Sequence, residues 1–150
     1  FSNYFSEKPK TEIEILKEVN KNSKVGIDGV NFILEKALDD EFKQMLYSQK
    51  SEYQNIYDRS KNLLLQYGEM AEDTPPLQKA MSWMGIQIST LTNTTDSKLA
   101  EILIQGNDMG IIKGTKLLNS TPFKQDSIRN ILNDFVGLQQ DNINELKKYL

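Results

Sequence analysis

The side chains whose type and spacing could do chemistry in this sequence are carboxylates and amides. Glu52 and Asn55 lie three residues apart, a spacing that places two oxygen ligands on one face of a helix. Two-metal carboxylate sites in four-helix bundles combine such glutamates with two Glu-x-x-His pairs. The chain contains no histidine and therefore no Glu-x-x-His pair. Carboxylate-based binding of a metal remains a rival hypothesis, with Glu52 and Asp108 as its candidate ligands.

The residues that are missing restrict the chemistry further. The sequence has neither cysteine nor histidine. Disulfides, thiolate nucleophiles and zinc–thiolate sites are therefore excluded. Histidine is the usual transition-metal ligand and the side chain best suited to acid–base work near neutral pH. We therefore predict that the protein is not an enzyme, and we assign no catalytic, cofactor-binding or metal-binding residue and no cofactor.

Composition indicates one soluble domain. The chain has 150 residues, a net charge of −3 and interspersed charges of both signs, which disfavours nucleic-acid binding. Its longest uncharged run, residues 80–95, includes polar side chains and is shorter than the about 20 apolar residues of a membrane span. We expect a cytoplasmic protein. Because the sequence begins with Phe1 rather than methionine, a preceding native segment or signal peptide stays an open alternative.

The first half of the chain predicts a tail and two long helices. Residues 1–10 lack periodicity and are expected to form an N-terminal tail, with the bundle domain over 11–150. Thr11 and Glu14 form a capping box at the start of the first helix. Asp39 or Asp40 can cap a second helix that ends near Gly68. The very short turn between them predicts antiparallel neighbours.

The second half predicts one short helix and two more long ones. Thr74 and Pro75 give a start signal for the short helix, and the run TNTTD at 92–96 ends it. Thr95 or Asp96 then caps a helix to about residue 119. Thr121 and Pro122 repeat the start signal for the last helix. No segment alternates as a strand would, so we predict an all-α antiparallel four-helix bundle with an extra short helix between the second and third long helices.

Helical periodicity places several polar residues on the inward faces of the long helices. These are Asn20, Ser23, Gln49, Ser60 and Asn142. They could line a polar pocket, or they could pair with one another and fix the register of the helices. Amides and hydroxyls without a strong acid or base favour pairing.

Gly106, Gly110 and Gly114 recur every four residues in the predicted third long helix, where each costs about 1 kcal/mol relative to alanine. Polar neighbours exclude a membrane pairing motif. We interpret the stripe as a seam of close packing against large side chains, and we expect Gly110→Leu to destabilise the fold by about 1–3 kcal/mol.

The order of these elements, together with AMSWMGI around Trp83, IQGND around Gly106 and the closing QQDNINEL, resembles an uncharacterised family of bacterial ferritin-like proteins, a domain of unknown function. It is more loosely similar to ferritin-like spore coat proteins. The resemblance implies a ferritin-like bundle with acidic ligands in its third and fourth helices. The positions where relatives carry acids or a histidine are here Ile104, Asn107 and Gln140, which implies a metal centre that has been lost.

Three hypotheses for function follow. The first is a non-enzymatic ferritin-like bundle that acts through protein contacts, with a protein partner or a second copy, such as a homodimer. The second is a carboxylate-based metal-binding or metal-storage bundle. The third is a small-ligand pocket between the helices.

Overall fold

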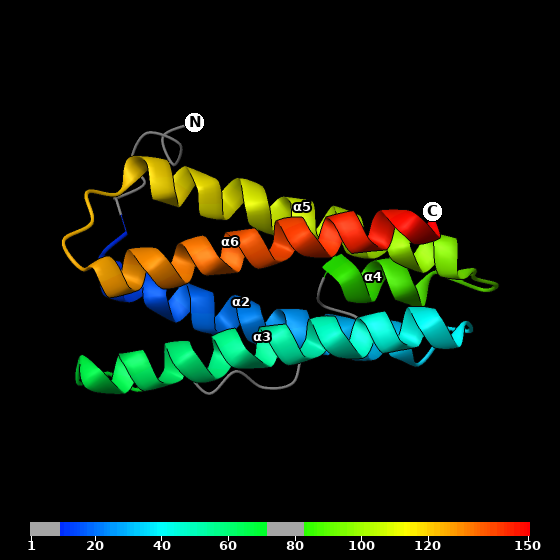
Figure 1. Cartoon of the computed structure of the whole chain (residues 1–150), viewed down its shortest axis with the longest axis horizontal. Coiled ribbons are helices and arrows are strands. Elements are labelled where there is room, and N and C mark those ends of the chain that lie inside the picture. Colours follow the sequence, from blue (N-terminus) through cyan, green and yellow to red (C-terminus); the bar gives the residue numbers. More distant parts are fainter. Residues whose placement is uncertain (1–9, 72–82) are drawn as a thin grey trace.

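The described part of the chain contains four long α-helices, one short α-helix and a short 3₁₀ helix. A computed structural model describes residues 10–71 and 83–150 of the chain (Figure 1). The elements are α2 (Glu12–Leu34), α3 (Asp40–Gln66), α4 (Trp83–Ser89), α5 (Asp96–Ser120), α6 (Asp126–Leu146) and the short 3₁₀ helix η1 (Lys147–Tyr149). The described ranges contain no strand, which agrees with the predicted all-α bundle. The expected tail over residues 1–9 and the start signal at Thr74 and Pro75 lie outside the described residues.

The predicted helix starts of α2 and α3 are confirmed. Thr11 and Glu14 form a reciprocal capping box, in which each side chain accepts a hydrogen bond from the other's backbone N–H. Of the two aspartates proposed for α3, Asp39 is the cap, and its carboxylate accepts from the N–H of Phe42 at 2.9 Å. These caps satisfy donors that have no partner inside a helix.

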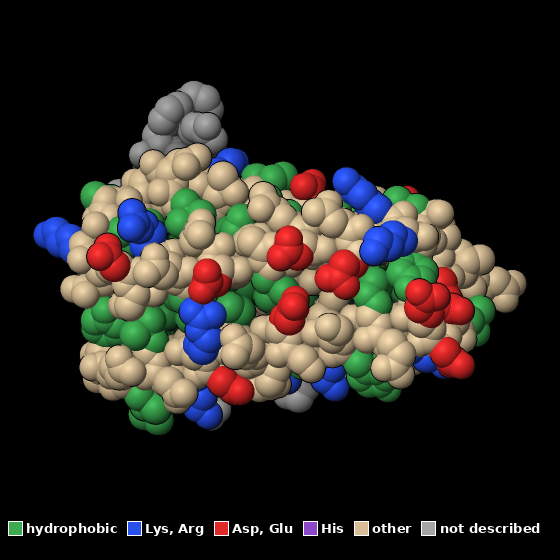
Figure 2. Space-filling view, in the orientation of Figure 1, with side chains coloured by type: hydrophobic (Ala, Val, Ile, Leu, Met, Phe, Trp, Pro, Cys, Tyr) green, Lys and Arg blue, Asp and Glu red, His purple; other side chains and the backbone are tan. Residues whose placement is uncertain are grey.

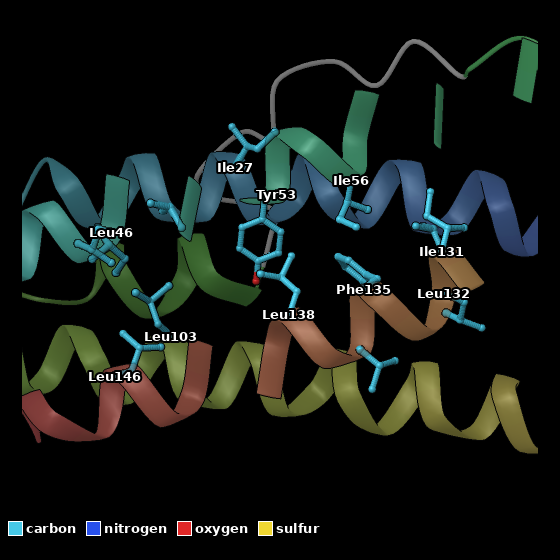
Figure 3. Close-up of a cluster of buried hydrophobic side chains, with 14 of the residues drawn as sticks. Ile27, Leu46, Tyr53, Ile56, Leu103, Ile131, Leu132, Phe135, Leu138 and Leu146 are labelled. Carbon is cyan, nitrogen blue, oxygen red and sulfur yellow. The ribbon is translucent and has the colours of Figure 1, made fainter. Parts of the chain in front are cut away.

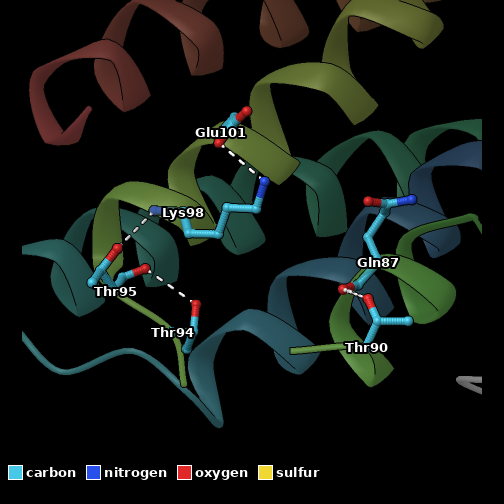
Figure 4. Close-up of polar contacts among 6 residues, drawn as sticks. All are labelled: Gln87, Thr90, Thr94, Thr95, Lys98 and Glu101. Atoms are coloured by element: carbon cyan, nitrogen blue, oxygen red, sulfur yellow. Dashed lines mark hydrogen bonds and ion pairs between the residues drawn. The ribbon is translucent and has the colours of Figure 1, made fainter. Parts of the chain in front are cut away.

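Thr95 is the cap of α5, and its hydroxyl accepts from the N–H of Lys98 at 3.1 Å (Figure 4). One turn on, the Lys98 ammonium reaches Glu101 at 3.2 Å. The break predicted over 92–96 is also confirmed, because α4 ends at Ser89 and α5 begins at Asp96.

The predicted start of the last helix at Thr121 and Pro122 is wrong. Thr121 ends α5 instead, with its N–H bonded to the carbonyl of Leu117, and α6 begins only at Asp126. A residue that precedes proline is pushed out of the helical region, and Thr121 is accordingly extended. The backbone N–H groups of Lys124 and Gln125 donate instead to the Glu12 carboxylate.

Two carboxylates at opposite ends of the bundle fix the directions of the helices. Glu12, at the start of α2, accepts from backbone just before α6, so α2 and α6 run the same way. Asp96, at the start of α5, accepts from the N–H groups of Leu38 and Asp39 at the turn between α2 and α3, so α5 runs parallel to α3 and antiparallel to α2. The end of α3 and the start of α5 therefore lie at opposite ends of the bundle (Figure 1).

α2 packs most closely against α3, and α5 against α6. The core between these pairs is built from the inward stripes that helical periodicity predicts, and Figure 3 shows side chains from both pairs meeting along the bundle axis. Fully buried members include Leu16, Phe42, Leu46, Leu99 and Ile128. In the described part of the chain, none of the helices combines the length and the apolar character of a membrane span.

Candidate functional site

All five polar residues that periodicity placed inside the bundle are buried. Asn20, Ser23, Gln49, Ser60 and Asn142 are each no more than 4% exposed. Tertiary structure adds two further amides, Asn107 on α5 and Gln139 on α6, at 5% and 6%.

The centre of the bundle is a network of neutral groups around Tyr53. The Tyr53 hydroxyl donates to Asn107 Oδ1 at 2.8 Å, and Asn107 Nδ2 donates to the carbonyl of Leu103 at 2.8 Å. Asn142 Nδ2 also approaches Asn107 Oδ1, at 3.4 Å. Figure 3 shows the Tyr53 ring directed into the middle of the core, with Phe135 near it, and the two rings meet edge to face.

The environment of Tyr53 makes it a poor acid–base group. Burial raises the pKa of the Tyr53 phenol to about 12, and hydrogen bonds from Asn142 and Gln139 oppose that rise only in part. The phenol therefore stays protonated near neutral pH. Its amide neighbours do not titrate, so this network can hold a shape or bind a polar group but cannot shuttle protons.

A second polar cluster joins α2 to α3. Asn20 Nδ2 donates to Ser60 Oγ at 3.0 Å and to the carbonyl of Tyr57 at 3.1 Å. The Ser23 hydroxyl donates to the carbonyl of Asn20. Each donor here has a partner within the pair of helices, as expected for polar residues that fix register.

Two acceptors at the centre have no partner. They are Gln139 Oε1 and Asn142 Oδ1, both buried within the bundle. A buried acceptor without a hydrogen bond destabilises the fold by about 1–3 kcal/mol, so it marks a place where a donor is missing.

The two acidic residues considered as metal ligands point away from this centre and from each other. Glu52 is exposed on α3, where burial together with Glu145 and Asp141 raises the pKa of its carboxyl. Asp108 is exposed on α5, and α3 and α5 lie at opposite corners of the bundle. Acidic side chains gather along the α3–α6 side of the molecule in Figure 2. Within the described ranges, however, no three acidic side chains converge as a metal site requires.

A partly buried carboxylate lies elsewhere, between α2 and α5. Glu18 on α2 pairs with Lys113 on α5 and with Lys10, at 2.5 and 2.7 Å. Burial alone would raise the pKa of the Glu18 carboxyl, but hydrogen bonds and charge from the two lysines outweigh it and hold the pKa below its ordinary value. Glu18 therefore forms a structural ion pair.

That ion pair lies at the rim of a groove of about 300 Å³ between α2 and α5, which we call the α2–α5 groove. Tyr53 from α3 and Leu132, Phe135 and Gln139 from α6 form part of its lining. Most of the remaining lining is apolar or glycine, including Val19, Val25, Gly26, Val30, Leu103, Gly106, Gly110, Gly114 and Leu117.

The prediction that the glycine stripe is a packing seam holds on one side of α5 only, because the other side faces the groove. Toward α6 the packing is close: a Cβ at Gly114 would lie 2.5 Å from Val136, and a Cβ at Gly110 would overlap the Gln139 amide. Toward α2 the same glycines line open space. α5 has glycines where it packs against α6. It makes far fewer contacts with α2, and the groove lies between these two helices.

Periodicity alone did not identify Asn107 and Gln139 as interior residues. Gln139 follows the buried Leu138, and Asn107 follows Gly106 of the glycine stripe, so each amide lies one residue beside its helix's apolar or glycine stripe. The bundle buries a wider arc of α5 and α6 than a single stripe, because each of these helices contacts several neighbours. The sequence feature that could have indicated Gln139 is Gly110, because the absence of a side chain there leaves space that the Gln139 amide occupies.

Comparison with known proteins supports the fold. No model of a protein family matches the chain, and no curated protein matches it. Among solved structures, the chain is similar to a DUF305 fragment from Deinococcus radiodurans, a domain of unknown function. The two share 13% sequence identity with a TM-score of 0.69, over 94% of this chain and 97% of the other. At this identity the likeness establishes a shared helical-bundle fold and nothing about activity.

Proposed function

We propose that this protein is a non-enzymatic, ferritin-like bundle in the cytoplasm whose metal centre is degenerate and which acts through protein contacts. The directions of the helices support the ferritin-like assignment. α2 and α3 are antiparallel, α5 and α6 are antiparallel, and a single long crossover joins the parallel helices α3 and α5. One such crossover distinguishes ferritin-like bundles from up-down-up-down bundles.

The observation that carries the non-enzymatic proposal is the neutral network at the bundle centre. Ferritin-like di-metal proteins project carboxylates and histidines inward from all four helices. Here the inward groups around the axis are the phenol of Tyr53 and the amides of Gln49, Asn107, Gln139 and Asn142. Neutral amides are weak ligands for iron and manganese, and none of these groups titrates near neutral pH.

Metal analysis tests this proposal. The purified chain is incubated with Fe²⁺, Mn²⁺ or Zn²⁺, passed through a desalting column and analysed for bound metal. We expect less than stoichiometric metal and no oxidation of Fe²⁺ above the buffer rate. Stoichiometric metal that is lost in Glu52→Ala would instead establish the carboxylate-based alternative.

The exposed face of α5 supports the role in protein contacts. Met109 and Ile112, three residues apart on that helix, are 52% and 50% exposed. Adjacent apolar side chains of this size on a helix surface are typical of contact sites. We propose that this face pairs with a second copy of the chain.

Sedimentation velocity over a hundredfold range of concentration tests the pairing. We expect Ile112→Lys to shift the protein toward monomer, whereas Lys61→Ala, exposed on α3, leaves the distribution unchanged. A monomer at all concentrations for the unaltered chain would refute the homodimer, and a pull-down from native cells would then test for another protein.

A further inference from the structure

The α2–α5 groove has the dimensions of a ligand site. Its volume of about 300 Å³ lies at the lower end of the range for small-molecule pockets. Its lining on α2 runs from Ile15 to Val30, which corresponds to about 22 Å along the helix at 1.5 Å per residue. The groove is therefore long and narrow.

The open space comes from side chains that are missing on both walls. Gly26 on α2 lies against the Tyr53 ring, since a Cβ there would approach that ring to 2.5 Å. Gly106, Gly110 and Gly114 on α5 also line the groove and add no side chain to it. A Cβ at Gly110 or Gly114 would run into Gln139 or Val136 of α6, so these glycines allow the close approach of α5 to α6 beside the groove.

An independent feature points to an occupant. Gln139 is only 6% exposed, and it is one of the residues that line the groove. Its Oε1 has no hydrogen-bond partner. The acceptor lies beside the Tyr53–Asn107 hydrogen bond, whose own donor and acceptor are already engaged. A molecule in the groove that donates one hydrogen bond would satisfy it.

We propose that the α2–α5 groove binds an elongated, uncharged, mainly apolar molecule whose single hydroxyl donates to Gln139 Oε1. The apolar lining provides the affinity for the body of the molecule, and the orphan acceptor selects for a donor on it. Met109 belongs both to the lining of this groove and to the exposed face of α5 that carries the proposed protein contacts, so the groove adjoins that face.

The charges at the groove disfavour an ionic ligand. At the rim Glu18 is paired with both Lys113 and Lys10, which leaves one positive charge on the solvent side, and the other polar groups of the lining are amides and the protonated Tyr53 phenol. A carboxylate brought inside would lose its hydration and would offer no donor to Gln139. A buried ammonium would carry a donor but would have no counter-ion there.

Isothermal titration calorimetry with three probes of matched chain length tests the proposal on the full chain. The probes are 1-octanol, its methyl ether and octanoate. We expect 1-octanol to bind at one site, and the ether, which lacks the donor, to bind about fivefold more weakly. We expect octanoate to bind more weakly than the alcohol.

Two variants locate the site, and circular dichroism checks that each remains helical. Val25→Phe places a ring in the groove and should remove binding of 1-octanol, whereas the matched control Ile112→Phe, outside the groove, should leave it unchanged. Gln139→Leu should abolish the preference for the alcohol over the ether while both still bind.

Specific outcomes would overturn the proposal. Failure of all three probes to bind the unaltered protein would refute the site, and this experiment needs no variant. Octanoate as the tightest ligand would show that Lys113 governs recognition of an anion. Equal affinities for the alcohol and the ether in the unaltered protein would show that Gln139 receives no hydrogen bond.

Discussion

The glycines of α5 give the sharpest test of the packing between α5 and α6. A Cβ at Gly114 would lie 2.5 Å from Val136 Cγ2, which is closer than real Cβ contacts allow. Val136 is only 6% exposed and is β-branched, so its side chain has one preferred rotamer in a helix and little room to turn. By contrast, a Cβ at Gly137 on α6 would meet nothing within 4 Å.

The expected magnitude follows from a comparison of Gly114→Ala with Gly137→Ala. Both variants gain about 1 kcal/mol of helix propensity, because each replaces glycine by alanine inside a helix. Only Gly114→Ala must also displace a packed neighbour, which costs about 1–3 kcal/mol. Gly137→Ala should therefore be about 1 kcal/mol more stable than the unaltered chain, and Gly114→Ala about 1–3 kcal/mol less stable than Gly137→Ala.

Urea denaturation followed by circular dichroism measures these differences. If the slope of unfolding free energy against urea is the same for all three proteins, a shift of the midpoint reports stability. In a domain of this size each kcal/mol also moves Tm by about 2–4 °C. Gly110→Ala should fall between the two variants, because its clash is with the flexible end of Gln139, which can turn into the groove.

A single result would refute this account of α5. If Gly114→Ala stabilises the protein as much as Gly137→Ala does, then α5 and α6 do not approach closely at Val136. The explanation of the groove as the consequence of that approach would then be wrong as well.

Three further predictions concern single side chains. Glu12→Ala should lower the free energy of unfolding by about 1 kcal/mol in urea denaturation, because two backbone N–H groups before α6 lose their acceptor. The pKa of the Glu52 carboxyl is raised in the folded protein, which means that the fold favours the protonated form over the charged one. This contribution to stability is fully present below the ordinary pKa and is lost as pH rises through the pKa of the folded state. Glu52→Gln should accordingly raise Tm near pH 7 and leave it unchanged below about pH 4. One of the six tyrosines should titrate near pH 12 in ultraviolet absorbance, and Tyr53→Phe should remove that step and destabilise the protein by about 1–2 kcal/mol.

The sequence by itself determined the helices and most of the core. Capping residues such as Thr11, Asp39 and Thr95 act on backbone groups within three residues, so their effect can be read locally. Helical periodicity likewise placed Asn20, Gln49 and other polar residues inside, because a face of a helix repeats at a fixed spacing. The local signal failed at Thr121, where the acceptor for the backbone before α6 is Glu12, more than a hundred residues away along the chain.

Only the tertiary structure decided what the interior can bind. The glycine stripe of α5 predicted close packing, but a pattern along one helix cannot say which neighbour is approached and which is left at a distance. That choice depends on the positions of α2 and α6, which leave the glycines packed on one side and facing a groove on the other. The unpartnered oxygen of Gln139 has the same origin, since whether a buried amide is satisfied depends on groups from other helices.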